Sequence, residues 1–361
     1  MNKPPKLTGK ILFIIIIFLC LLSVEVGLRA ASYFNGRVLF SELTVDDPLL
    51  DWKLAPNYCQ KVGAVRVNSK GFRGPEFSNN KNGLIRVIVL GDSCVFGAGA
   101  SGDEFTLSRL LEKRLNLDLR DSSYEVINAG VPGYTSSQCL LYLKNELLNL
   151  SPDTIILYCG WNDIWAYRNP YSNTAAIPFL RSLSRVMSKS LTFTLFRNKI
   201  LTPIRNKSHY LLRKQVNNAE LLIDDHLKKT TLDIFEENLY RMIQIARQNG
   251  VKVLILTIPT SVKMSLPDKV KETFSPHDYW REGFKGFMDM YSSVNQVIRN
   301  LRLEEGAKII VVDGEFKRFS DQEIGVLFSD FVHPNDKGYG IIADIVYLSL
   351  VKEASFRGEK Q

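Results

Sequence analysis

The chain has 361 residues, of which 45% are hydrophobic and 23% are charged, with 46 Lys and Arg against 38 Asp and Glu. This composition excludes a disordered, collagen-like or disulfide-stapled protein. A chain of this length forms one large α/β domain or two ordinary domains, and either buries enough apolar surface to be stable without metals or crosslinks.

The positive charge is concentrated in one segment of the chain. The net charge is +8, yet no acidic residue occurs between Asp163 and Glu220, where ten Lys and Arg lie. The remainder of the chain is close to neutral, so the basicity is a local feature and not a property of the fold. Because a pI raised in this way is poor evidence for nucleic-acid binding, we expect no nucleic-acid partner.

The cysteines and histidines are too scattered to predict a metal site. Five Cys and four His occur with no C-x-x-C pair, whereas a zinc site needs several closely spaced ligands. We therefore expect no metal site. We also expect no cofactor. One disulfide is possible, but Cys139 and Cys159 lie in apolar runs and are more simply interpreted as buried thiols.

The N-terminus predicts a membrane anchor. Residues 11–24 are almost wholly apolar and follow three Lys, and a helix extended through residue 28 approaches the ~30 Å of the hydrocarbon core of a bilayer. By the positive-inside rule, residues 1–10 lie in the cytoplasm, a signal-anchor transmembrane helix covers 11–30, and the rest of the chain is extracytoplasmic, in the periplasm. The alternative is a cleaved signal peptide with its site at Ala30-Ala31-Ser32. Both interpretations export the rest of the chain.

Beyond the anchor, short apolar runs alternate with helical patterns. Five runs bounded by Gly or Asp predict buried strands at residues 85–91, 125–130, 154–160, 251–258 and 308–313. Helix-like stretches occur at about residues 104–116, 136–148, 231–249, 281–304 and 338–352. Alternating strands and helices are typical of an α/β protein with a parallel sheet, helices on both faces and right-handed crossovers. We therefore predict a three-layer αβα fold with a five-stranded parallel sheet.

Reactive and polar residues follow these strands. The first strand ends in Gly91-Asp92-Ser93, the second in Asn128-Ala129-Gly130 and the third in Gly160-Trp161-Asn162-Asp163, and Asp330 and His333 precede the last helix. Ligands of such sheets bind beyond the carboxyl ends of the strands, so we expect these residues on one rim. A hydroxyl, an imidazole with a carboxylate and several hydrogen-bond donors meet the requirements of acyl transfer.

In this order, the motifs resemble those of the SGNH (GDSL) hydrolase family. The residues that carry the resemblance are Gly91-Asp92-Ser93 with Gly97, then Gly130, then Gly160 to Asp163, and finally Asp330 and His333. The resemblance covers about residues 60–350, and residues 164–230 match least. Residues 68–74 also resemble a segment of membrane-anchored bacterial members. Cys94 departs from the first motif, which most commonly has a hydrophobic residue at this position. The resemblance implies the flavodoxin-like fold of SGNH hydrolases.

The resemblance also implies a role for each residue. Ser93 would attack an ester carbonyl, His333 would take its proton and return it to the leaving alcohol, and Asp330 would orient the imidazole. The backbone N–H groups of Ser93 and Gly130 and the side-chain amide of Asn162 would form the oxyanion hole. A side chain at position 130 would hinder the approach of the oxyanion to the backbone N–H, which accounts for glycine there.

Each of these residues also has an ordinary structural interpretation. A Ser after a strand commonly caps a helix, and Gly130 or Gly160 alone would be an ordinary turn glycine. Four matches in a fixed order at strand ends favour the catalytic interpretation. Asp92 and Asp163 are expected to have supporting roles, Asp163 by holding the loop that presents Asn162.

Residues 164–230 are too many for an ordinary connection and predict an insertion with its own structure. Apolar residues at helical spacing between 179 and 191 alternate with Arg and Lys, which predicts a basic amphipathic helix. The insertion could be a solvated cap on the core, could shape the acyl or glycan pocket, or could contact anionic lipid headgroups. A linker and N-terminal extension at 31–80, a hydrolase domain at 81–352 and a tail at 353–361 complete the predicted organisation.

These observations favour a serine ester hydrolase that removes or transfers O-linked acyl groups through a Ser-acyl intermediate. The expected substrate is an O-acyl group, first of all O-acetyl, on a cell-envelope saccharide. Alternatives among enzymes are a lipid esterase or lysophospholipase and an acyltransferase. From a different class, the alternative is a non-catalytic binding or assembly protein of the envelope that only recognises an acylated glycan.

Overall fold

The computed structural model describes residues 7–35, 43–60, 64–81, 83–118, 123–168, 192, 219–263, 265, 267–268, 283–303 and 306–358. Contacts divide the chain into two compact units, one made of Met1–Leu43 and Asn173–Val216 and the other of Thr44–Ser172 and Asn217–Gln361. The predicted basic helix between 179 and 191 lies outside the described residues, as does most of the predicted insertion.

The described part of the first unit consists mainly of helix α1 (Leu7–Asn35). Its window Ile11–Ala30 has 20 residues with a mean hydropathy of 3.0, which is long and apolar enough to cross a membrane. A signal sequence satisfies the same criteria. The charges within this window are paired, because Arg29 Nε lies 2.9 Å from Glu25 Oε1. The other Glu25 oxygen accepts hydrogen bonds from the backbone N–H and the hydroxyl of Thr192.

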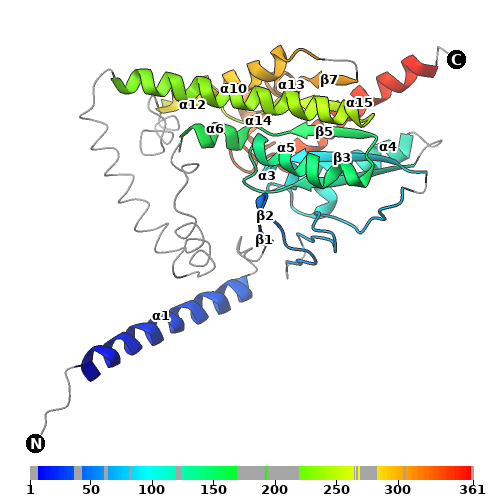
Figure 1. Ribbon diagram of the computed structural model, residues 1–361. Helices are drawn as coiled ribbons and strands as arrows, with labels where there is room; N and C mark the ends of the chain where they lie inside the picture. The colour runs from blue at the N-terminus through cyan, green and yellow to red at the C-terminus, as the bar shows by residue number, and fades with distance from the viewer. Residues whose placement is uncertain are drawn as a thin grey trace, which may run out of the picture. The chain divides into compact units, whose positions relative to one another are not determined.

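The second unit is built on a parallel sheet of five strands, as predicted (Figure 1). The strands are β3 (Ile85–Gly91), β4 (Tyr124–Gly130), β5 (Thr154–Tyr158), β6 (Lys252–Leu256) and β7 (Ala307–Ile310). Their order in the sheet is β4-β3-β5-β6-β7, and every neighbouring pair is parallel. β3 and β5 are central and almost wholly buried, because both faces of the sheet are covered. This is the flavodoxin-like topology.

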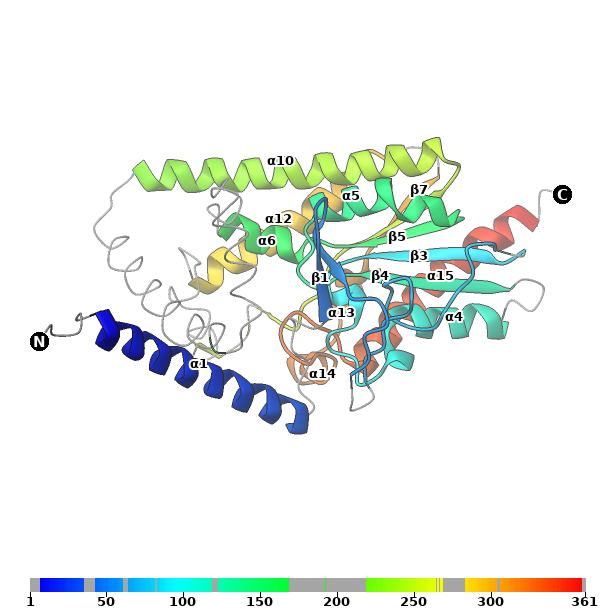
Figure 2. The same ribbon diagram turned by 60° about the horizontal axis from the view of Figure 1, so that its bottom comes forward.

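Helices cover both faces of this sheet (Figure 2). One face carries α5 (Ser136–Asn145), α10 (Ala219–Gln248) and α12 (Gly283–Asn300), and α10 contacts the other two. The other face carries α4 (Leu107–Asp118) and α15 (Asp336–Gly358), which pack against each other. Apolar side chains of these helices, such as Leu111 in α4 and Phe235 in α10, are fully buried. The structure confirms the predicted three-layer fold.

Short helices fill the connections. They are α3 (Ser93–Phe96) and the 3-10 helix η1 (Asp103–Phe105) after β3, the 3-10 helix η2 (Leu147–Leu150) after α5, α6 (Trp161–Arg168) after β5, and α13 (Val312–Phe316) and α14 (Asp321–Gly325) after β7. Because α3 and α6 begin at the first and third predicted motifs, helix starts fix the positions of both motifs at the carboxyl edge of the sheet.

Several boundaries differ from the prediction. β7 ends at Ile310, because Val312 and Asp313 already belong to α13, where the buried Asp313 carboxylate pairs with Arg299 and Lys317. β5 ends at Tyr158, before the predicted residue 160. α10 begins at Ala219, inside the predicted insertion. An apolar run alone does not show where the backbone changes from strand to helix geometry.

The second unit begins with an antiparallel hairpin of β1 (Thr44–Asp47) and β2 (Asp51–Leu54). Asp47 fixes the turn, since its Oδ1 accepts hydrogen bonds from the backbone N–H groups of Leu49 and Leu50 at 3.0 and 2.9 Å. Leu50 and Leu54 are fully buried. Residues 44–54, which fall in the predicted linker and extension, therefore form an ordered part of the unit that contains the sheet.

Candidate active site

Ser93 lies where β3 ends and α3 begins, at the carboxyl edge of the sheet. Asp92 caps α3, because its Oδ1 accepts the backbone N–H of Cys94 at 2.9 Å. Gly91 is required at the strand end, since a Cβ there would collide with the backbone carbonyl of Tyr158 in β5. This tight turn places a partly buried serine just beyond the strand.

The structure brings Asp330 and His333 to this serine from far along the chain. His333 Nε2 lies 2.8 Å from Ser93 Oγ, and His333 Nδ1 lies 2.7 Å from Asp330 Oδ2. The other Asp330 oxygen accepts the backbone N–H groups of Val332 and His333 at 2.7 and 2.8 Å. Since an ionised carboxylate only accepts hydrogen bonds, these partners place the imidazole proton on Nδ1 and leave Nε2 to accept from the serine hydroxyl.

The surroundings of Asp330 keep its carboxyl ionised. Burial by itself would raise the pKa of Asp330, but hydrogen bonds from the His333 ring and from the backbone of His333 and Val332 outweigh it and hold the pKa below its ordinary value. The Asp330 side chain is 47% exposed, so solvent screens part of its charge. An anion at this place stabilises a positive charge on the neighbouring imidazole.

Gly130 ends β4 directly beside α3. A Cβ at this position would overlap the backbone nitrogen of Phe96, so the packing of β4 on α3 by itself requires glycine. The Gly130 N–H donates to Asn128 Oδ1 at 3.0 Å, and the Asn128 amide nitrogen donates to the carbonyl of Val95 at 2.9 Å. The N–H expected in the oxyanion hole is thus already partnered within the chain, and close packing is a reason for glycine that the sequence did not reveal.

Asn162 lies in the first turn of α6. Its Nδ2 donates to the carbonyl oxygen of Tyr134, in the connection between β4 and α5, at 3.0 Å. Because the amide carries two N–H bonds, it can donate a second hydrogen bond to a bound acceptor. Trp161 anchors this turn, since its indole is fully buried and stacks on Tyr291 of α12 with ring centroids 5.7 Å apart.

Asp163 connects α6 to α5 and α10 through a buried network. Its carboxylate accepts the backbone N–H of Ser136 at 3.0 Å and the Ser136 hydroxyl at 2.6 Å. Asn238 of α10 donates to the same Ser136 hydroxyl and to the Ser137 hydroxyl, both at 2.9 Å. Burial raises the pKa of Asp163 to about 6, although hydrogen bonds from Ser136 oppose the shift. The network ties the turn that carries Asn162 to two other helices.

Asp92 and Cys94 are both fully buried next to the serine. One Asp92 oxygen caps α3, and the other has no hydrogen-bond partner among the described residues. Burial raises the pKa of Asp92 to about 6 against the opposing hydrogen bond from Cys94. Burial also raises the pKa of the Cys94 thiol well above its ordinary value, which disfavours the thiolate and makes Cys94 unsuited to be a nucleophile.

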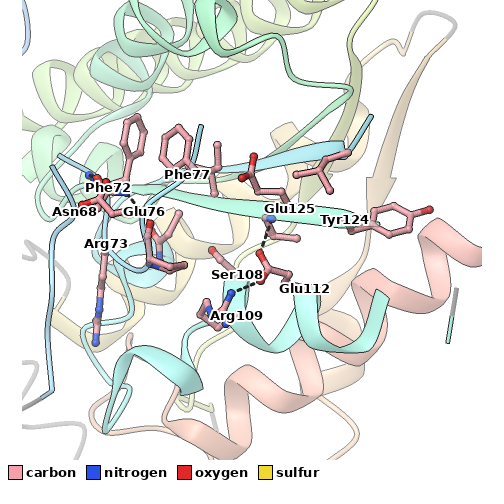
Figure 3. A pocket seen from close by; sticks show the side chains of 15 residues that line it. Asn68, Phe72, Arg73, Glu76, Phe77, Ser108, Arg109, Glu112, Tyr124 and Glu125 are labelled. Carbon is pink, nitrogen blue, oxygen red and sulfur yellow. Dashed lines mark hydrogen bonds and ion pairs between the residues drawn. The ribbon is translucent and has the colours of Figure 1, made fainter. Parts of the chain in front are cut away.

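A cavity of about 210 Å³ lies along the outer edge of β4, between α4 and residues 68–77 (Figure 3). Glu112 of α4 closes part of this edge, because its carboxylate pairs with Arg109 and accepts the backbone N–H of Val126 at 2.8 Å. A side chain that occupies a backbone N–H of an edge strand, as Glu112 does here, hinders pairing of that strand with another chain. The cavity contains none of the residues predicted to be catalytic, so it is distinct from the rim around Ser93.

Sequence reasoning missed Tyr134, Ser136 and Asn238. The helix predicted at 136–148 does begin at Ser136, and a capping box of Thr135 and Gln138, visible in the sequence as T-x-x-Q, marks this start. The contacts of the Ser136 side chain had no such signal. Neither Tyr134 nor Asn238 belongs to a motif, because their contacts depend on tertiary packing alone.

Metal-ligating side chains do not cluster in the described part of the chain, where no group of three or more His, Cys, Asp or Glu could hold an ion. All five cysteines are free thiols, and Cys94, Cys139 and Cys159 are buried.

Residues 89–341 match the model of the GDSL-like lipase/acylhydrolase family. The match spans most of the chain and includes Ser93, Gly130, Asn162, Asp330 and His333. The chain therefore belongs to the GDSL-like lipase/acylhydrolase family, and this membership indicates an esterase or lipase activity. A search of curated protein sequences found no match.

Several solved structures are similar to this chain. A GDSL-like lipase from Bacteroides thetaiotaomicron is 14% identical with a TM-score of 0.40, and the alignment covers 77% of this chain and 93% of that one. An acetyl xylan esterase is 18% identical with a TM-score of 0.43, covering 73% and 99%. The psychrotrophic esterase EstA from Pseudoalteromonas sp. is 15% identical with a TM-score of 0.41, covering 75% and 99%.

Proposed function

We propose that the chain is a serine ester hydrolase in which Ser93 is the nucleophile, His333 the general base and Asp330 the residue that orients the imidazole. The observation that carries this assignment is the hydrogen-bonded series from Ser93 Oγ to His333 Nε2 at 2.8 Å and from His333 Nδ1 to Asp330 Oδ2 at 2.7 Å. A nucleophile within hydrogen-bond reach of a base that a third group holds is the arrangement that activates a hydroxyl.

The reaction consists of two acyl transfers. Ser93 Oγ attacks the ester carbonyl carbon while His333 Nε2 takes the hydroxyl proton, and Asp330 stabilises the imidazolium that forms. The tetrahedral intermediate then expels the alcohol oxygen, which receives the proton from Nε2. Water attacks the acyl-Ser93 ester by the same path and releases the carboxylic acid. An acceptor alcohol in place of water would receive the acyl group instead, so the same site serves a hydrolase or an acyltransferase.

The oxyanion hole is proposed to consist of the backbone N–H groups of Ser93 and Gly130 and the side-chain amide of Asn162. The Gly130 N–H already donates to Asn128 Oδ1, so it takes part only as a shared donor. Ser93 and Asn162 are therefore expected to carry most of the charge stabilisation. Removal of one such donor costs on the order of 100- to 1000-fold in rate.

The proposed substrate is an O-acyl group, first of all O-acetyl, on a saccharide of the cell envelope. Helix α1 supports a location at the membrane. We propose, from the positive-inside rule alone, that residues 1–10 lie in the cytoplasm and the sheet unit in the periplasm. An exported enzyme held at a membrane meets envelope polymers and lipids. A lipid ester is the competing substrate, and the preference for acyl-chain length separates the two.

Hydrolysis of aryl esters of increasing acyl length by the full-length protein in detergent micelles tests this function. Turnover that is highest for acetate and falls with chain length supports the O-acetyl substrate, whereas turnover that rises with chain length favours a lipid ester. Ser93→Ala is the control and should not exceed the rate without enzyme. Wild-type turnover by Ser93→Ala would refute the mechanism, and absence of turnover by both proteins would favour a non-catalytic binding role.

A further inference from the structure

We infer that Trp52, in the N-terminal hairpin, is a positioning residue for Asn162 and acts through Tyr134. This role rests on the proposed function, since it concerns the amide donor of that same oxyanion hole. Trp52 lies in β2, outside residues 89–341 that match the family model. The hairpin therefore supports the active site from outside the part of the chain that the family shares.

Tyr134 is the direct contact of Asn162. The Asn162 amide donates to the Tyr134 carbonyl oxygen at 3.0 Å, so the direction of its second N–H depends on where this carbonyl lies. Tyr134 belongs to the connection between the end of β4 at Gly130 and the start of α5 at Ser136. Gly133 in this connection has a φ of +89°, which favours glycine. Backbone hydrogen bonds hold part of this connection, from the Tyr134 N–H to the Val131 carbonyl oxygen at 3.2 Å and from the Val131 N–H to the Gly91 carbonyl oxygen at 3.1 Å. Side-chain contacts from other elements add to these bonds.

Trp52 supplies such contacts to three consecutive residues of the connection. The Tyr134 hydroxyl donates to the backbone carbonyl of Trp52 at 2.6 Å, and the indole N–H of Trp52 donates to the Pro132 carbonyl at 3.1 Å. The Trp52 and Tyr134 rings meet edge to face with centroids 5.9 Å apart. A Cβ on Gly133 would lie 3.0 Å from the indole ring, so the ring packs directly on the Gly133 backbone.

The hairpin is itself fixed to the same region. Gln138 in the first turn of α5 donates to the Leu50 carbonyl at 3.0 Å, and the Leu50 side chain is fully buried. Tyr134 is also fully buried, and its ring packs edge to face on Tyr142 of α5. A hydrogen bond in such a low-dielectric site is stronger than the same bond in water. Loss of the Trp52 contacts should therefore shift the Tyr134 carbonyl and, with it, the Asn162 amide.

Steady-state kinetics of Trp52→Phe and Tyr134→Phe in the full-length protein test this role. Trp52→Phe removes the indole N–H, and Tyr134→Phe removes the phenol hydroxyl. We expect kcat on an aryl acetate to fall about tenfold in each variant, because a displaced catalytic group loses this much or more. KM should stay near the wild-type value, since an oxyanion donor acts mainly in the transition state. Tyr124→Phe, at the other end of β4, is the matched control and should keep the wild-type kcat.

A double-mutant cycle with Asn162→Ala separates positioning from a general structural effect. In the Asn162→Ala background, Trp52→Phe should lower kcat by less than about twofold, because the group that it positions is gone. A tenfold loss in both backgrounds would show that Trp52 does not act through Asn162 and would overturn the inference. Loss of folding in both Trp52→Phe and Tyr134→Phe, measured by thermal unfolding, would also overturn it and leave the hairpin a purely structural element.

Different variants distinguish an error in the role of Trp52 from an error in the proposed function. If Asn162→Ala lowers kcat and the two aromatic variants do not, the role of Trp52 is wrong and the proposed function stands. If Ser93→Ala and Asn162→Ala both keep the wild-type kcat, the proposed function is wrong. In that case no effect of Trp52 on kcat could be assigned to the oxyanion hole.

Discussion

Asp330 binds both the ring and the backbone of His333. One carboxylate oxygen accepts from Nδ1, and the other accepts the backbone N–H groups of Val332 and His333. The loop around the histidine is therefore folded on the same carboxylate that orients the imidazole. Since this carboxylate is about half exposed, at 47%, water replaces part of its electrostatic effect when it is removed.

The exposure of Asp330 predicts that its substitution has a smaller effect than substitution of Ser93 or His333. Ser93→Ala and His333→Ala should each abolish turnover, because the nucleophile and the base have no substitutes. Asp330→Ala should leave more residual activity, since solvent screens its charge and the variant still contains both Ser93 and His333. The measurement is kcat/KM on an aryl ester, with circular dichroism to confirm folding. An Asp330→Ala variant as inactive as Ser93→Ala would show that solvent does not compensate.

Asp163 predicts a pH dependence of stability. Its pKa is raised to about 6 from an ordinary value of 3.8, so the folded state binds the proton more tightly than the unfolded chain. The stability from this proton is fully present below about pH 4 and is lost as the pH rises through about 6. The pKa of the buried Asp92 is also raised to about 6, so its ionisation likewise lowers the free energy of unfolding as the pH rises.

Asp163→Asn keeps the shape of the side chain and cannot ionise. Urea unfolding at pH 4, 5, 6 and 7 should show that the free energy of unfolding falls less steeply with pH in Asp163→Asn than in the wild type. The difference in slope should approach about 1.4 kcal/mol per pH unit between pH 4 and 6. Parallel pH profiles for the two proteins would mean that Asp163 titrates normally in the folded state.

At the scale of elements, close backbone packing explains two glycines of the motifs. Gly91 faces the backbone of β5, and Gly130 faces the backbone of α3, with no space for a Cβ at either position. The proposed site of chemistry and these close backbone contacts therefore both lie at the carboxyl edge of the sheet. A glycine in a catalytic motif can therefore be required by the fold alone.

Gly130→Ala should destabilise the fold strongly. The added methyl would overlap backbone rather than a side chain, so we expect a loss of about 3 kcal/mol or more, at the upper end for overpacking. Gly340→Ala in α15 is the control, because nothing lies near its Cβ position and alanine favours a helix by up to about 1 kcal/mol. Chemical denaturation measures both changes. A Gly130→Ala protein with wild-type stability would contradict the packing explanation.

The sequence predicted the strands, the parallel sheet and the residues at its carboxyl edge, because buried strands of parallel sheets are short apolar runs and their ends carry the motifs. It did not predict the end of β7, since residues 309–312 form an unbroken apolar run up to an Asp that the structure buries in an ion-paired helix. It also did not predict that Trp52 contacts the connection before α5, or that Asn238 contacts Ser136. These contacts join residues about 80 to 100 positions apart, and no local pattern encodes them.

At the scale of the whole molecule, the fold converts distant motifs into one site. The order β4-β3-β5 places the ends of three neighbouring strands side by side, and the loop before α15 returns His333 to the first of them. Helix α1 adds a segment long enough to span a bilayer, whose charges are paired. The basic insertion lies mostly outside the described residues, and its roles as cap, pocket wall or lipid contact stay predictions.

Helix α1 predicts that the protein stays in the membrane. The full-length protein should remain in the membrane fraction after a carbonate wash, because the 20-residue window Ile11–Ala30 is long and apolar enough to cross the hydrocarbon core. A reporter fused after Gln361 should be active outside the cytoplasm, by the positive-inside rule. Recovery of a soluble form that starts near Tyr33 would establish cleavage of a signal peptide instead, and a cytoplasmic reporter would contradict export.

The central claim is that Ser93 is a nucleophile activated by His333, and covalent labelling by a fluorophosphonate tests it most directly. The reagent reacts with an activated serine without any need for the natural substrate. We predict one adduct per chain, located on Ser93 by peptide mass spectrometry, and no adduct in Ser93→Ala or in folded His333→Ala. An unlabelled wild-type protein, or an adduct on another residue that persists in Ser93→Ala, would contradict the account.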